Sequence, residues 1–163
     1  MAMAQQGRQF HPLPVIGYPE TYYAKHIQQA DAAGDTLAHN AYKVGQYVTL
    51  GLDVKASWED KSKCFRHTLK HHCVPPVDAD PETEGFYTKL RDLVCRYASN
   101  EALRLARQEH DAYTMRLELG ESRDTLVEEA EVFFPNILGH GECPEWCSPQ
   151  VWKQLCTLRD QWI

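Results

Sequence analysis

Apolar and small residues after Pro19 recur at alternating steps of four and three positions. They are Tyr23, Ile27, Ala30, Gly34, Leu37, Ala41, Val44 and Val48. This alternation places them along one face of an α-helix, because a helix completes a turn every ~3.6 residues. The sequence therefore predicts a long N-terminal helix over residues 19–50 that buries this face. Gly34 has a poor helix propensity, so a bend or break is expected there.

The rest of the chain continues with segments of helical period, each bounded by residues that start or stop helices. The start signals are Ser57, Asp80, Ser122 and Ser148, whose side chains can accept hydrogen bonds from first-turn amides. The stop signals are Pro75, Gly120 and Pro135. At Asn100 the apolar register slips, so either a helix ends there or one long helix carries a stutter.

These patterns predict an all-α fold, a compact bundle of about five helices, because no segment alternates like a strand. A length of 163 residues suits one domain. We expect a single helical domain over residues 19–163. Residues 1–18 contain Pro12 and Pro14 and have no periodicity, so a flexible N-terminal arm is expected there.

Charge and hydropathy narrow the classes of function. The 23 acidic side chains outnumber the 17 basic ones, giving a net charge of −6, which disfavours a nucleic-acid partner. No run of about 18 apolar residues predicts a membrane span, and the N-terminus lacks the apolar core of a secretory signal. We therefore expect a cytoplasmic protein whose six cysteines are free. In a secreted protein, Cys143 and Cys147 would become disulfide candidates.

A Cys/His pattern in the second helical segment is the strongest chemical feature. Cys64, His67 and His71 lie within about 60° of one another on a helical wheel. Two histidines four residues apart can hold one zinc or similar ion, and a thiolate one turn away can be a third ligand. The alternative interpretation is a polar surface, because Arg66 and Lys70 are interspersed and would disfavour a cation.

A second Cys/His cluster lies in the loop that precedes the last predicted helix. His140, Cys143 and Cys147 could supply three zinc ligands, although their spacing is not that of a zinc knuckle. This loop could also share an ion with the Cys64 face. The alternative is a loop anchored by Trp146 with two buried free thiols.

Two further histidines, His72 and His110, fall on apolar stripes. Such a histidine can bind a cofactor, for example as an axial ligand of haem iron. It can also simply hydrogen-bond a buried partner. His110 is followed by Asp111 and preceded by Arg104, but neither pairing has the surroundings of a catalytic motif. Phosphate-binding loops and nucleophile elbows are absent from the sequence.

The functional hypothesis is a non-catalytic helical protein that binds a protein partner as an adaptor, inhibitor or immunity-type factor. It is supported by the acidic composition, the lack of enzyme motifs and the small residues of the first helix, which also suit self-association. The alternative hypothesis is a metalloprotein that holds zinc, or haem or iron, through the Cys/His face of the second helix.

Overall fold

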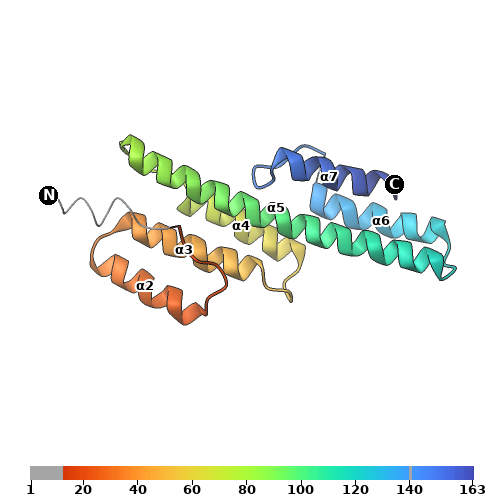
Figure 1. Cartoon of the computed structure of the whole chain (residues 1–163), viewed down its shortest axis with the longest axis horizontal. Helices are drawn as coiled ribbons and strands as arrows, with labels where there is room; N and C mark the ends of the chain where they lie inside the picture. Colours follow the sequence, from red (N-terminus) through yellow and green to blue (C-terminus); the bar gives the residue numbers. More distant parts are fainter. Residues whose placement is uncertain (1–12, 140) are drawn as a thin grey trace. The chain divides into compact units, whose positions relative to one another are not determined.

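The computed structural model describes residues 13–139 and 141–163, and their regular structure is entirely helical (Figure 1). The helices are α2 (Glu20–Ala32), α3 (Thr36–Gly51), α4 (Trp58–His72), α5 (Pro81–Glu118), α6 (Arg123–Leu138) and α7 (Pro149–Asp160). No strand occurs within these residues, so the predicted all-α class is confirmed. None of these helices is both long and apolar enough to cross a lipid bilayer.

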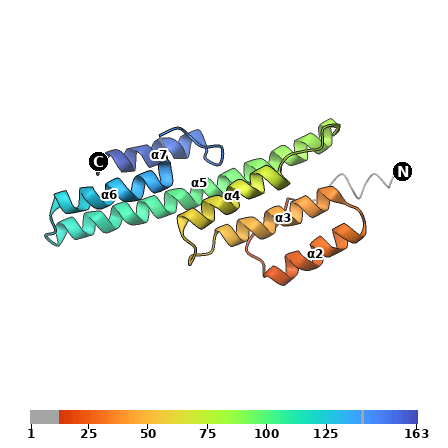
Figure 2. The same cartoon turned by 180° about the vertical axis from the view of Figure 1, so that it is seen from behind.

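The chain divides into two compact units, Met1–Val94 and Cys95–Ile163, and the boundary falls inside α5. The first unit contains α2, α3, α4 and the start of α5, and the second contains the rest of α5 with α6 and α7 (Figure 2). Of the arm predicted over residues 1–18, residues 1–12 lie outside the described part. The single domain expected over residues 19–163 stays a prediction.

The predicted N-terminal helix over 19–50 is two helices, which corrects the expected length. Gly34 has φ +68°, a left-handed conformation that ends α2 and turns the chain. Asp35 then caps α3, because its carboxylate accepts a hydrogen bond from the Ala38 amide at 3.1 Å. The apolar stripe continues across the break, and α2, whose buried residues are Tyr23, Ile27 and Ala30, packs against α3.

Residues 13–18 are held against α2 and α3 by hydrogen bonds around the buried hydroxyl of Tyr23. This hydroxyl donates to the Val15 carbonyl at 2.6 Å, and it lies 3.1 Å from the Thr49 hydroxyl. Thr49 in turn accepts a hydrogen bond from the Gly17 amide at 2.9 Å. Gly45 allows the close approach, since a Cβ there would lie 2.8 Å from the Tyr23 ring.

The core of the first unit is formed where α3 packs between α2 and α4. Val44, Val48 and Phe65 are fully buried there. Lys61 is also buried, and its ammonium donates hydrogen bonds to the carbonyl oxygens of Gly51 and Asp53 at the end of α3. The negative end of the helix dipole stabilises a cation at this position, and the ammonium satisfies the last carbonyl groups by hydrogen bonding.

In the second unit, two predicted helix boundaries are settled. The helix α5 runs through Asn100 without a break, so the single long helix is the alternative found. The stop predicted at Pro135 is wrong, because α6 continues to Leu138. Proline removes a single amide donor, and here the helix extends one turn beyond it until Gly139 adopts φ +63°. The start of α7 is capped by Ser148, which accepts from the Val151 amide.

Candidate functional site

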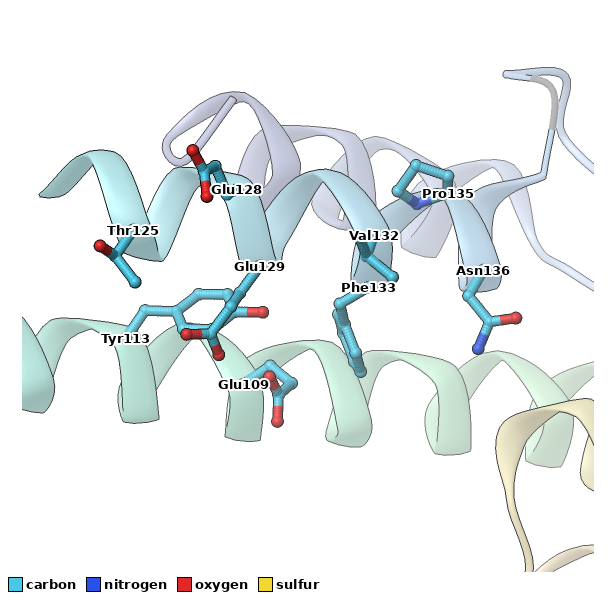
Figure 3. A pocket seen from close by; sticks show the side chains of 9 residues that line it. All are labelled: Glu109, Tyr113, Thr125, Glu128, Glu129, Val132, Phe133, Pro135 and Asn136. Carbon is cyan, nitrogen blue, oxygen red and sulfur yellow. The ribbon is translucent and has the colours of Figure 1, made fainter.

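A groove with a volume of about 890 Å³ lies between α5 and α6 in the second unit (Figure 3). Nine residues line it: Glu109, Tyr113, Thr125, Glu128, Glu129, Val132, Phe133, Pro135 and Asn136. Two of them come from α5 and the other seven from α6. On α6 they recur at steps of three and four residues, so they share one face of that helix.

The charge of this groove is negative. Glu109, Glu128 and Glu129 contribute carboxylates, and none of the nine lining residues is basic. Arg116 lies beside the groove and donates to Glu129 at 2.7 and 2.8 Å, and it also pairs with Glu121. These hydrogen bonds lower the pKa of Glu129, so that carboxyl stays ionised. Glu128 is exposed, and Figure 3 shows its carboxylate directed away from α5.

Tyr113 lines the groove from the α5 side. The residue is 1% exposed, and its ring packs against Trp162 at a centroid distance of 5.4 Å. Burial raises the pKa of the phenol, and a hydrogen bond to the Glu109 carboxylate raises it further. The hydroxyl therefore stays protonated at neutral pH.

An apolar surface lies beside these carboxylates, further along α6 (Figure 3). Val132 is 75% exposed although it is aliphatic. Phe133 is half-buried, and its ring points toward α5 in Figure 3, while Pro135 continues the surface one turn later. The arrangement thus combines exposed apolar area with fixed negative charge, which is the composition of a binding surface for a cationic amphipathic ligand.

The predicted metal ligands on α4 are only partly brought together. His67 and His71 are exposed, with ring centroids 4.5 Å apart. Cys64 is half-buried, and its thiol donates to the Tyr47 carbonyl on α3 at 3.0 Å. Burial raises the pKa of this thiol, which disfavours the thiolate that a metal would bind.

His72 lies beside these residues and is held by a polar chain. The amide of Asn40 donates to the Tyr87 hydroxyl at 2.8 Å, and its oxygen faces His72 Nδ1 at 3.0 Å. Since an amide oxygen only accepts, Nδ1 carries the proton and Nε2 the lone pair. Burial lowers the pKa of His72 to about 4, aided by the nearby His39, His67, Lys43 and His71.

The other predicted cofactor ligand, His110, lies in the second unit. It is half-buried on α5, and its ring meets the edge of Trp162 at a centroid distance of 5.9 Å. The Asp111 carboxylate lies 3.9 Å from its Nδ1. His72 and His110 thus belong to different units, and their use as cofactor ligands stays a prediction.

Cys143 and Cys147 lie in the loop before α7. Cys143 is exposed and its thiol donates to the Cys147 carbonyl, whereas Cys147 is buried. Burial raises the pKa of Cys147 to about 12, so its thiol stays protonated at neutral pH. Trp146 is buried beside it, and its carbonyl accepts from Ser99 on α5. His140, the third residue of this predicted cluster, lies outside the described part.

Within the described residues, no three His, Cys, Asp or Glu side chains are placed to hold one metal ion as they lie. The three-ligand sets predicted from the sequence, Cys64 with His67 and His71 and the set built on Cys143 and Cys147, remain predictions. Compared with known proteins, the chain matches no family model, no curated protein and no solved structure.

Sequence reasoning missed the groove and the arginine beside it. The glutamates of α6 are typical of a solvated helix face, and nothing in one helix tells which residues of α5 will lie opposite. The available signal was Val132, an aliphatic residue outside the apolar stripe of Leu126, Ala130 and Phe134.

Proposed function

We propose that the protein is a non-catalytic interaction protein, whose α5–α6 groove binds a basic amphipathic segment of a partner protein. The observation that carries the proposal is the apolar surface of the exposed Val132 and the half-buried Phe133 beside three glutamates, with no basic residue lining the groove. Lysine or arginine side chains of the partner would face the glutamates, while its apolar side chains would cover Val132.

The choice of a partner over a second copy of this chain rests on charge. The chain carries a net charge of −6, so two copies repel one another, whereas a basic partner is attracted from a distance. The six cysteines are all free thiols, which suits the reducing cytoplasm as the place where the partner is met.

The test is binding of a labelled model peptide that is an amphipathic helix of leucine and lysine. Its counterpart of leucine and glutamate has the same apolar pattern and the opposite charge. We expect saturable binding of the lysine peptide and at least about tenfold weaker binding of the glutamate peptide, measured by fluorescence anisotropy. Equal affinity for both peptides, or binding of neither, contradicts the proposal.

Two matched charge reversals locate the binding surface. Glu128→Lys changes a lining residue, and Glu131→Lys makes the same change at an exposed position of α6 that does not line the groove. We expect the first to weaken binding of the lysine peptide about fivefold or more, and the second to have less than half that effect. Equal losses would mean that the peptide senses only net charge.

Removing the arginine beside the groove should strengthen binding of the lysine peptide, whereas Glu128→Lys should weaken it. Arg116 neutralises Glu129 and Glu121 through paired hydrogen bonds. Arg116→Gln should release one more negative charge to the groove and tighten binding of the lysine peptide. Weaker binding by this variant, with an unchanged circular dichroism spectrum, would count against electrostatic recognition at this groove.

A further inference from the structure

We propose that His67 and His71 form a two-histidine clamp on the surface of α4 for a divalent transition-metal ion of the Ni²⁺ and Zn²⁺ class. This site belongs to the first unit and is independent of the α5–α6 groove. It replaces the set that includes Cys64, because that thiol donates to the Tyr47 carbonyl of α3.

The separation of the rings fits two adjacent positions of one coordination sphere. A metal bound to an imidazole nitrogen at about 2.1 Å lies roughly 3.2 Å from the ring centroid. Two centroids 4.5 Å apart then subtend about 90° at the ion, which suits neighbouring ligands of Ni²⁺ and is near the tetrahedral angle of Zn²⁺. Both side chains are exposed, so an ion reaches them without a change in the helix.

Within the described residues, no third His, Cys, Asp or Glu side chain is placed to share an ion with this pair as the side chains lie. The ring centroid of His72 lies 5.8 Å from that of His67 and 6.5 Å from that of His71. Its Nδ1 is hydrogen-bonded to the Asn40 side chain, which in turn donates to the Tyr87 hydroxyl. The ion is therefore bound by two protein nitrogens, and its other positions are left to water or to an external ligand.

The neighbouring charges set the class of ion. Arg66 and Lys70 are exposed on the same helix, and residues 64–73 contain no Asp or Glu. Hard cations such as Mg²⁺ need oxygen ligands and negative charge, which the site lacks. Ions that bind neutral imidazole tolerate these surroundings better, because the metal–nitrogen bond does not require a charged ligand.

The test is calorimetric titration of the full chain, free of any histidine tag, with NiCl₂, ZnCl₂ and MgCl₂. We expect one saturable Ni²⁺ site that His71→Ala weakens about tenfold or more, and no Mg²⁺ binding. His67→Ala should have the same effect. Alanine is a good helix former, so both variants should keep the helical spectrum of the parent.

Two control variants test whether the loss of affinity is specific to the clamp. His26→Ala removes a histidine of α2 outside the clamp and should leave the Ni²⁺ affinity unchanged, and Lys70→Ala should leave it unchanged or raise it. An excess of Ni²⁺ should raise the melting temperature of the parent and not of His71→Ala, because the ion joins successive turns of the folded helix. Unchanged affinity in His71→Ala, or no Ni²⁺ binding at about 1 mM, overturns the proposal.

Discussion

At the scale of the residue, the first unit depends on polar side chains that lie inside it. Lys61 is 1% exposed and donates to the last carbonyls of α3, so its charge is compensated by the helix end. Burial and the nearby cationic groups lower the pKa of His72 and keep it neutral, and the hydrogen bond to Asn40 orients its ring. Neither role can be derived from the residue type, because both depend on what a neighbouring helix brings close.

Replacing the buried ammonium should destabilise the fold. Lys61→Met keeps most of the side-chain volume but removes the donors to Gly51 and Asp53. We expect the free energy of unfolding to fall by about 2 kcal/mol, as is typical for lost hydrogen bonds of a charged donor. The measurement is urea denaturation, with Lys63→Met as the control, because Lys63 is exposed and pairs with Glu59 at the surface. Equal effects of the two substitutions would disprove the role of Lys61.

The low pKa of His72 makes the stability depend on pH. In the unfolded chain this histidine takes up a proton near pH 6.5, whereas in the folded protein it does so only near pH 4. The unfolded state therefore binds more protons between these values, and stability falls as the pH drops from about 6.5 to 4. Because the side chain is only half-buried, we expect a loss on the order of 1 kcal/mol at pH 5.

This pH dependence is checked by urea denaturation at pH 7.5 and pH 5. His72→Gln should remove the part of the stability loss at pH 5 that protonation of His72 causes. His26→Gln, which changes a histidine of α2, should lose as much stability at pH 5 as the parent protein. A parent protein and a His72→Gln variant with the same change in stability between the two pH values would contradict the assignment.

At the scale of the element, the sequence predicts faces and caps better than lengths. Ser57 and Ser148 cap α4 and α7 through hydrogen bonds to Asp60 and Val151, as expected from local chemistry. A bend or break is expected at Gly34, but one long helix is still predicted over residues 19–50, and the stop predicted at Pro135 is wrong. An apolar stripe that keeps its register across a turn looks continuous in sequence, and a proline near a helix end can be tolerated when one further turn is packed.

The backbone conformations of Gly34 and Gly85 predict opposite effects when each glycine is replaced by alanine. Gly34 adopts φ +68°, so Gly34→Ala should lower the free energy of unfolding by about 1 kcal/mol. Gly85 lies inside α5 with open space around its Cβ position, so Gly85→Ala should raise it by up to about 1 kcal/mol. Thermal denaturation measures both, and a stabilised Gly34→Ala would show that the backbone there is not left-handed.

The candidate sites were predictable to different degrees. The spacing of His67 and His71 lies within one helix, so their proximity follows from the helical period alone. The position of Cys64 depends on α3, and the groove depends on the pairing of α5 with α6. Contacts between helices are not encoded by the period of either helix, which is why Glu109 and Tyr113 could not be assigned to a site in advance.

At the scale of the whole molecule, the excess of acidic side chains should guide association. A net charge of −6 attracts a basic partner over several ångströms, and dissolved salt screens that attraction. We expect the affinity for the leucine–lysine peptide to fall steadily as NaCl is raised from about 50 to about 500 mM, mainly through a slower association rate. Stopped-flow fluorescence measures both rates. An association rate that does not change with salt would mean that charge does not guide binding.

The proposal of a binding groove is tested most directly by mapping amide chemical shifts while the leucine–lysine peptide is added to isotope-labelled protein. The account predicts shift changes concentrated at Glu109, Tyr113 and the α6 face from Thr125 to Asn136. Control amides of α2 in the first unit should not move. Changes spread evenly over acidic residues of both units, or none in this part of α6, would contradict it.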